Sequence, residues 1–210
     1  MVEKPYVVVM GDIVDSREIR EREKFQNGFV SLLEEVNSKY SSSLAAELTL
    51  IRGDEFQGLF KKGGDALRAI FDIYFSIDPV RMRFAVGCGN VETAFYSDVQ
   101  KMDGPVFHRA REALEKAKEK QRKIFACGLD EDGEIETAWN IMGWMVFSRL
   151  DAQTFRQKEA VFLALQGKKQ KEIAEITKVG KSAISQRLKS SGWEQIKTAA
   201  GWMEKQLEQV

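Results

Sequence analysis

Short apolar runs and longer amphipathic stretches alternate through the first half of the chain. Residues 6–10 are apolar and mostly β-branched, and the run is too short for a helix, so it predicts a buried strand. Two further strand-like runs, 48–51 and 56–60, flank a Gly-Asp turn signal and predict a hairpin. A helix is predicted over residues 17–40, where apolar residues recur at helical spacing: Phe25, Phe29, Leu32, Leu33 and Val36.

The same alternation continues to residue 127. Residues 66–74 predict a second helix and residues 82–86 a further strand, whereas residues 90–103 resemble a surface loop. Gly104-Pro105 opens a third helix, because Pro suits a first helical turn, and residues 123–127 predict the last strand. The sequence therefore predicts an α+β fold. Residues 1–130 are expected to form a ferredoxin-like βαββαβ palm domain, with helices on one face of its sheet.

The remaining residues have a helical pattern throughout. Residues 131–150, rich in Trp and Met, predict a connecting helical segment that contributes to a core or interface. Residues 151–210 predict a small all-α domain, whose closing helix, residues 193–210, is expected to pack on that domain or on a second chain.

Charge and cysteine usage narrow the function classes. Lys plus Arg and Asp plus Glu balance at 32 each, but residues 151–210 carry 11 basic against 7 acidic residues, so a basic partner surface is expected there. Cys88 and Cys127 are far apart, which predicts two buried thiols and neither a disulfide framework nor a zinc site. No leader or membrane span is evident, and a cytoplasmic location is expected.

Acidic residues end or turn two of the predicted strands. Asp12 follows the first strand, Asp54 lies in the hairpin turn 42 residues later, and adjacent strands would bring the two carboxylates together. Two such carboxylates suit a divalent cation, with phosphate groups completing its coordination shell. The alternative is a pair of solvated aspartates without metal. Asp15 or Ser16 is expected to cap the helix of residues 17–40, and that helix N-terminus, with Arg17 nearby, suits a phosphate.

Residues 170–188 resemble the helix-turn-helix of bacterial regulators. Small Ala174 allows two helices to approach, and residues 168–189 hold seven basic residues against two Glu, which favours duplex DNA. Lys178 stands where such motifs usually have Gly, and Thr177 where an apolar residue is usual. The alternative is a protein-binding three-helix module. If this motif binds DNA, the second helix is expected to contact bases and phosphates through five residues: Lys181, Ser182, Ser185, Gln186 and Lys189.

The acidic motifs also resemble those of nucleotide cyclases. Residues 52–56 (RGDEF) differ at one position from the GGDEF signature of diguanylate cyclases, and residues 11–14 (GDIV) resemble the metal-binding strand of those enzymes and of class III cyclases. With residues 86–89 and 104–111, the whole chain resembles the SatD family. The cyclase resemblance implies Mg2+ or Mn2+ at Asp12, Ile13 (through its carbonyl), Asp54 and Glu55. It implies a purine nucleotide near Asp15, Ser16, Arg17, Arg52, Gly53 and Arg111.

The chain departs from the cyclase pattern at groups that turnover needs. Arg52 replaces a Gly that makes room for the nucleotide. If Arg111 matches the cyclase Arg, Phe107 stands where an Asn belongs; anchoring on Gly104 instead puts His108 and Glu112 at those places. A surface role is expected for His108.

The sequence therefore predicts a DNA-binding regulator whose palm binds metal and nucleotide as a signal. An active nucleotidyl cyclase or related phosphoryl-transfer enzyme and a non-catalytic scaffold are the alternatives. Because helix-turn-helix proteins commonly bind DNA as dimers, a homodimer is one expected state.

Overall fold

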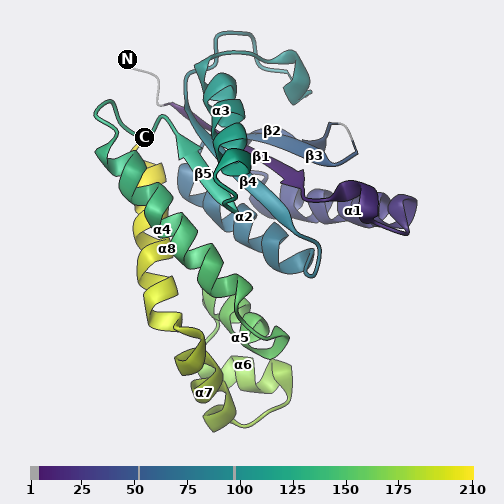
Figure 1. The fold of residues 1–210 in the computed structure, drawn as a ribbon, viewed down its shortest axis with the longest axis vertical. Helices are drawn as coiled ribbons and strands as arrows, with labels where there is room; N and C mark the ends of the chain where they lie inside the picture. The colour runs from purple at the N-terminus through teal and green to yellow at the C-terminus, as the bar shows by residue number, and fades with distance from the viewer. Residues whose placement is uncertain (1–4, 52, 97) are drawn as a thin grey trace.

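A five-stranded mixed sheet forms the centre of the protein. The computed structural model describes residues 5–51, 53–96 and 98–210 (Figure 1). The strands lie in the order β2-β3-β1-β4-β5; β1 is antiparallel to both of its neighbours, and β5 joins β4 in parallel at one edge. The α+β class is therefore confirmed. The strands are β1 (Tyr6–Ile13), β2 (Leu44–Leu50), β3 (Glu55–Phe60), β4 (Met82–Gly89) and β5 (Ile124–Cys127).

Helices cover both faces of this sheet (Figure 1). One buried cluster joins Val7 and Val9 of β1 to α1 (Arg22–Tyr40) and α2 (Gly63–Ser76). A second cluster joins Val8 and Met10 to α3 (Pro105–Glu119). The prediction of helices on one face was wrong. Successive strand residues point to opposite faces, and the first strand is apolar at every one of these four positions, so both faces need cover.

The C-terminal region is helical, as predicted, and returns to the sheet. In Figure 1, α4 and α8 lie side by side and lead from the sheet to the end of the molecule that holds α5, α6 and α7. Trp139 Nε1 donates a hydrogen bond to the Met203 carbonyl at 3.2 Å, which fastens α4 to α8. The helices are α4 (Glu134–Asp151), α5 (Phe155–Leu165), α6 (Gln170–Thr177), α7 (Lys181–Ser191) and α8 (Trp193–Gln209).

Helix α8 packs mainly on α2 and α4 of its own chain. Gly63, at the start of α2, makes this possible, because a Cβ there would overlap the backbone of Leu207. The closing helix therefore shares the core of the sheet region. The expectation that it packs on the C-terminal module or a second chain was incomplete, because an apolar stripe in a sequence does not identify its partner.

The first helix begins later than predicted. Residues 16–18 form a single 3-10 turn, and α1 starts at Arg22 with Glu21 as its N-cap residue. Asp15 and Ser16 do not cap α1: Asp15 pairs with Arg81 at 2.5 Å, and Ser16 Oγ donates to Asp54 Oδ2 at 2.8 Å. The capping prediction was wrong because both side chains bind groups from other elements.

The segment between β4 and α3 contains more structure than the surface loop predicted there. Within it, Val99–Lys101 form a 3-10 turn, η2. Val99 and Met102 are buried in the cluster beneath α3. These two apolar side chains fasten the segment to the sheet, which the polar residues around them concealed in the sequence.

The left-handed position of the turn between α6 and α7 is not occupied by glycine. Lys178 ends α6 in the left-handed conformation, with φ 53° and ψ 41°. The turn is held by the Val179 N–H, which donates to the Ala174 carbonyl at 3.1 Å, and by Thr177 Oγ1, which donates to the Ile173 carbonyl at 2.7 Å. The polar Thr177 is thus accommodated, whereas the Cβ of Lys178 carries a steric cost of about 1 kcal/mol.

Replacing Lys178 with Gly is expected to raise the free energy of unfolding by about 1 kcal/mol, because Gly adopts this backbone conformation without the Cβ clash. Urea unfolding measures the change. Lys205→Gly, which removes the same side chain from the exposed face of α8, should instead destabilise by about 1 kcal/mol. A Lys178→Gly variant no more stable than the wild type would show that the turn is not strained.

Candidate functional site

A row of charged side chains crosses three strands at one end of the sheet. Asp12 of β1 lies opposite Glu55 of β3 and opposite Arg83 of β4. Arg83 Nη1 is 3.6 Å from one Asp12 oxygen, and Lys118 Nζ of α3 is 3.8 Å from the other. Arg111 Nη2, also from α3, is 2.5 Å from Glu55 Oε1. The row therefore lies beneath α3, and basic side chains surround its two carboxylates.

The hairpin turn is fastened to the same end of β1. The Ile13 N–H donates to the Asp54 carbonyl at 2.9 Å, and Ser16 Oγ donates to the Asp54 carboxylate. Gln26 Nε2 of α1 donates to the Gly53 carbonyl at 3.1 Å, and Gly53 has a φ of 82° that favours glycine. The structure thus brings together the four residues expected at a metal.

The residues expected at a nucleotide are less closely grouped. Asp15 points to Arg81, Arg17 is exposed in the 3-10 turn, and Arg111 is engaged by Glu55. Arg52 lies outside the described residues. Because α1 starts at Arg22, its N-terminus is not at Asp15 and Ser16, and the phosphate position predicted there loses the support of that helix.

The environment disfavours a negative charge on Asp12. Burial raises the pKa of this carboxyl, Lys118 and Arg83 lower it in part, and the nearby Asp54 and Glu55 raise it further. Glu55 Oε1 is buried and lies 2.5 Å from Arg111 Nη2, so its charge is already paired. A cation placed beside Asp12 and Asp54 would favour the ionised form of Asp12.

Asp12→Asn is expected to stabilise the metal-free protein at neutral pH. The folded-state pKa of Asp12 is raised, so the ionised form costs stability above the ordinary value of 3.8, and the variant removes that cost. As the pH falls through the raised pKa, Asp12 takes up a proton and the advantage of the variant should vanish. Melting temperatures from pH 4 to pH 8 test this. A variant less stable than the wild type at pH 7 would show that the pairs with Arg83 and Lys118 outweigh the burial.

The donor set fits a divalent cation completed by a ligand. Within the described ranges no group of three or more His, Cys, Asp or Glu side chains converges as a preformed cage. Mg2+ commonly takes only one or two protein carboxylates, with phosphates and water filling the remaining positions. Asp12 and Asp54 supply two carboxylates of that kind, and Glu55 lies next to them with one oxygen paired to Arg111.

A basic cavity of about 410 Å³ adjoins the charged row. Arg83 and Lys118 belong to both, and Arg122 stacks on the Trp144 ring at 4.6 Å. Burial lowers the pKa of Lys123, so an anion here would favour its charged form. The basic residues that line the cavity are Arg81, Arg83, Lys118, Arg122 and Lys123. Among the described residues, Asp151 is the one acidic residue on the cavity wall.

Sequence reasoning missed this cavity. Arg81 and Arg83 precede or begin a strand, and Arg122 and Lys123 follow a helix, where basic residues usually face solvent. The sequence did contain a signal, which lies in the four residues taken together. All four are basic and stand at the boundaries of two strands, and the structure pairs these strands in parallel.

The second helix of the predicted DNA-binding motif has two distinct faces. Ile184 and Leu188 are buried in the shared core. Arg187 turns inward, 3.8 Å from Glu159. The five residues predicted to meet DNA are all exposed on the outer side of α7: Lys181, Ser182, Ser185, Gln186 and Lys189.

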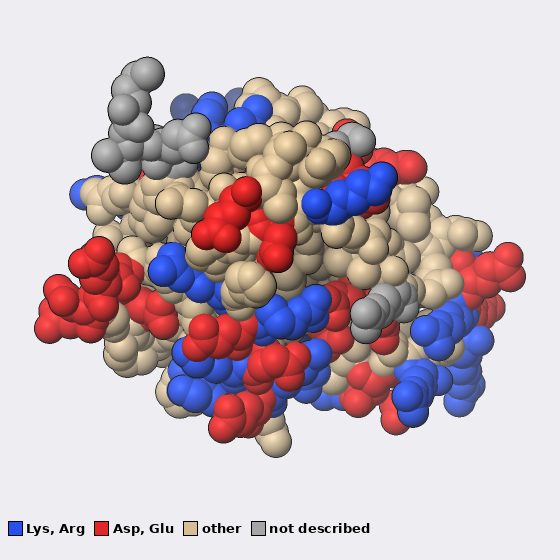
Figure 2. Space-filling view, turned by 90° about the horizontal axis from the view of Figure 1, so that it is seen from above, with Lys and Arg blue, Asp and Glu red and all other residues tan. Residues whose placement is uncertain are grey.

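Charge is mixed on the face of the molecule opposite α7 (Figure 2). Figure 2 shows the end of the molecule opposite α7, where acidic and basic side chains are interspersed. His108 is exposed near the start of α3, 3.2 Å from Asp103, as expected of a surface residue. Cys88 and Cys127 are buried free thiols, as predicted.

In the described part of the chain, no helix is long and apolar enough to cross a bilayer.

Comparison with known proteins identifies the family. The SatD family model matches residues 6–199, so the chain belongs to the SatD family. A search of curated proteins found no match.

Among solved structures, the fold resembles nucleotide cyclase catalytic domains. A bacterial light-regulated adenylyl cyclase is 17% identical with a TM-score of 0.45, over 59% of this chain and 75% of that one. A guanylyl cyclase domain from the fungus Blastocladiella emersonii is 13% identical with a TM-score of 0.44, over 54% and 75%. A guanylate cyclase domain from Catenaria anguillulae, in complex with GTP, is 13% identical with a TM-score of 0.42, over 54% and 73%.

Proposed function

We propose that this protein is a DNA-binding regulator in which a cyclase-like palm, residues 1–130, binds a divalent cation and a purine nucleotide as its signal. Residues 131–150 connect it to the helix-turn-helix domain, residues 151–210. The observation that carries the proposal is helix α7, whose outer side presents only polar and basic side chains while its inner side is anchored in the core. A helix of this kind suits the major groove.

The charge around α7 favours a polyanion. Of the seven basic residues between 168 and 189, Arg187 is turned inward, and the remaining six lysines are all exposed: Lys168, Lys169, Lys171, Lys178, Lys181 and Lys189. Each lysine that contacts a phosphate releases condensed counterions, so binding should weaken steeply with salt.

The C-terminal end of α7 is also held firmly, as a DNA-recognition helix requires. Arg149 of α4 donates from Nε to the Ser191 carbonyl at 3.0 Å and from Nη2 to the Ser190 carbonyl at 2.9 Å. Gly192, with a φ of 74°, then allows α8 to begin at once. The orientation of α7 is therefore fixed relative to α4 and the sheet.

Binding of duplex DNA by the full chain should depend on the outer side of α7. Lys181→Ala is expected to weaken binding to all sequences alike and to reduce the salt slope by about 1, since it removes a phosphate contact. Gln186→Ala should cost about 1–3 kcal/mol only on preferred sequences, because it removes a base contact. Fluorescence anisotropy at several salt concentrations measures both effects.

Lys205→Ala is the matched control for charge, because Lys205 is exposed near the far end of α8. It should bind DNA as the wild type does. If all three variants bound equally well, α7 would be a protein-binding surface and the scaffold alternative would be favoured.

For the palm, the carboxylate row and the basic cavity support one ligand that spans them. The cation would be held by Asp12, Asp54 and Glu55, with the Ile13 carbonyl nearby, and would neutralise phosphate charge. The phosphates would then extend towards Arg83 and Lys118, which border both the row and the cavity. Trp144, with 49% of its surface exposed, offers a face for a base. Asp15, Ser16, Arg17, Arg52, Gly53 and Arg111 remain proposed nucleotide contacts around this position.

An active cyclase is the second candidate, and two observations weigh against it. Phe107 is a buried residue of α3 and offers no polar group, and Arg111 is held by Glu55. In the other register, Glu112 pairs with Lys116 at 2.7 Å. Incubating the protein with Mg2+ or Mn2+ and ATP or GTP, followed by chromatography, should return the nucleotide unchanged. A cyclic or linear product that disappears in Asp12→Asn and Asp54→Asn would establish the enzyme instead.

A further inference from the structure

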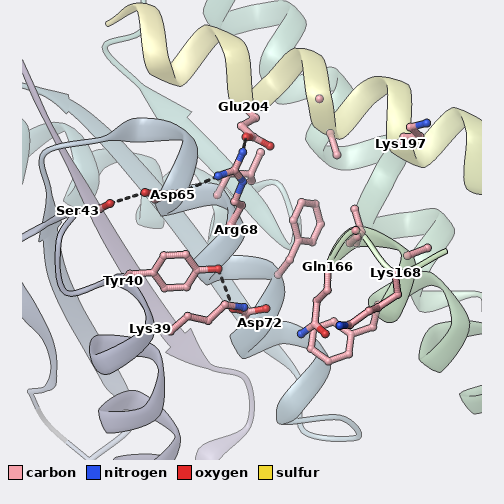
Figure 3. A pocket seen from close by; sticks show the side chains of 18 of the residues that line it. Lys39, Tyr40, Ser43, Asp65, Arg68, Asp72, Gln166, Lys168, Lys197 and Glu204 are labelled. Atoms are coloured by element: carbon pink, nitrogen blue, oxygen red, sulfur yellow. Dashed lines mark hydrogen bonds and ion pairs between the residues drawn. The ribbon is translucent and has the colours of Figure 1, made fainter. Parts of the chain in front are cut away.

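A second, larger cleft of about 810 Å³ lies between the sheet helices and the C-terminal helices (Figure 3). One wall comes from the end of α1 and from α2, and the other from α5, the α5–α6 turn and α8. The volume is typical of a small-molecule site, and such sites favour the junction of two structural parts. None of the proposed metal, nucleotide or α7 contacts lines it.

The carboxylates of this cleft already have partners. Tyr40 Oη and Lys39 Nζ donate to Asp72 at 2.8 and 2.6 Å. The Arg68 guanidinium lies between Asp65 and Glu204, and it joins α2 to α8 (Figure 3). With their lone pairs and charge satisfied in this way, the carboxylates do not offer a site for a cation.

Two lysines on the opposite wall are free by comparison. Lys168, on the α5–α6 turn, and Lys197, on α8, line the cleft and are exposed. Neither side chain has an ion pair or hydrogen bond to any residue that the structure describes, whereas Lys39 and Arg68 are both paired. The unpaired charge of the cleft is therefore positive and lies on its C-terminal wall.

Apolar and aromatic side chains adjoin these lysines. Phe162, Leu165 and Trp193 line the same wall and are only partly buried, so they retain surface that a ligand could cover. The space beside Gly201 of α8, which also lines the cleft, is open, since a Cβ built there meets no atom within 4 Å. A wall of this composition complements a molecule with a flat apolar part and an anionic group.

We propose that the cleft binds a small organic anion with a planar apolar portion, its charged group beside Lys168 and Lys197. The proposal uses none of the residues proposed to bind metal or nucleotide and none of the five α7 residues proposed to contact DNA; Lys168 is shared only with the general positive charge around α7. The ligand would touch the α5–α6 turn directly before α6 as well as the sheet helices, so its occupancy would be transmitted to both parts of the molecule.

The test uses two fluorescent probes on the full chain. One is 8-anilinonaphthalene-1-sulfonate, an anion with a planar naphthalene ring system, and the other is its uncharged relative N-phenyl-1-naphthylamine. We expect saturable binding of the anion to a single site. Replacing both Lys168 and Lys197 with Ala should weaken it about tenfold or more without changing affinity for the neutral probe, because only the charge-assisted contacts are lost.

Gly201→Leu should abolish binding of both probes, because the new side chain fills open space in the cleft. Gly28→Leu on α1, where a Cβ also meets nothing within 4 Å, is the matched control and should bind both probes normally. Melting curves verify that each variant is folded. If the double lysine variant kept full affinity for the anion, or if Gly201→Leu bound both probes as the wild type does, the proposal would be overturned.

Discussion

Asp54→Asn is expected to abolish the stabilisation that Mg2+ with a purine triphosphate gives to the wild type. A ligand present at about 100 times its Kd, bound only by the folded state, adds about 2.7 kcal/mol. In a chain of this size that corresponds to about 5–10 °C in Tm. The Asn side chain still accepts the hydrogen bond from Ser16 and loses only the charge that a cation needs.

Thermal melting with and without Mg2+ and nucleotide measures this difference. Asp132→Asn removes a carboxylate of the same kind from an exposed turn and should keep the full stabilisation. An Asp54→Asn protein that gains as much as the wild type would rule out Asp54 as a metal ligand and, with it, the proposed site.

Gly87→Ala is expected to destabilise the protein by about 3 kcal/mol, or roughly 6–12 °C in Tm. A Cβ at this position of β4 would overlap the backbone of Ala110 and Val106 in α3, and backbone atoms cannot rotate away. The helix that carries Arg111 and Lys118 would have to move off the sheet. Thermal unfolding followed by circular dichroism provides the measurement.

Gly28→Ala makes the same chemical change where the space is open, and it should stabilise α1 by about 0.5–1 kcal/mol. Equal stability of the Gly87→Ala variant and the wild type would mean that α3 does not lie directly on β4. In that event the ion pairs that α3 makes with Asp12 and Glu55 would need revision.

The parts of the fold that local patterns govern could be predicted from the sequence. Apolar runs identified the strands, helical spacing identified most of α2, and Gly104-Pro105 identified the start of α3. The hairpin signal placed Asp54 beside the first strand, because a hairpin turn restricts where its residues can lie. Local chemistry was misleading at Asp15 and Ser16, since a capping residue type does not reveal that Arg81 or Asp54 competes for it.

The features that depend on long-range packing could not be predicted. Met203 and Leu207 form an apolar stripe, but nothing in the sequence states that α4 and α2 are what they cover. The basic cavity also required the structure, because Arg83, Lys118 and Lys123 come from β4, α3 and the turn before β5, and each alone resembles a solvated charge. The cleft beside Lys168 and Lys197 exists only because α8 returns to the sheet helices.

The central claim, a DNA-binding regulator that responds to a nucleotide, is tested most directly by one measurement. The dissociation constant of the full chain for duplex DNA should be determined by fluorescence anisotropy at low salt, with and without Mg2+ and ATP or GTP. The account predicts salt-dependent binding in both conditions, a changed affinity when metal and nucleotide are present, and loss of that change in Asp54→Asn. An absence of duplex binding at low salt, or an affinity that metal and nucleotide leave unchanged in the wild type, would contradict it.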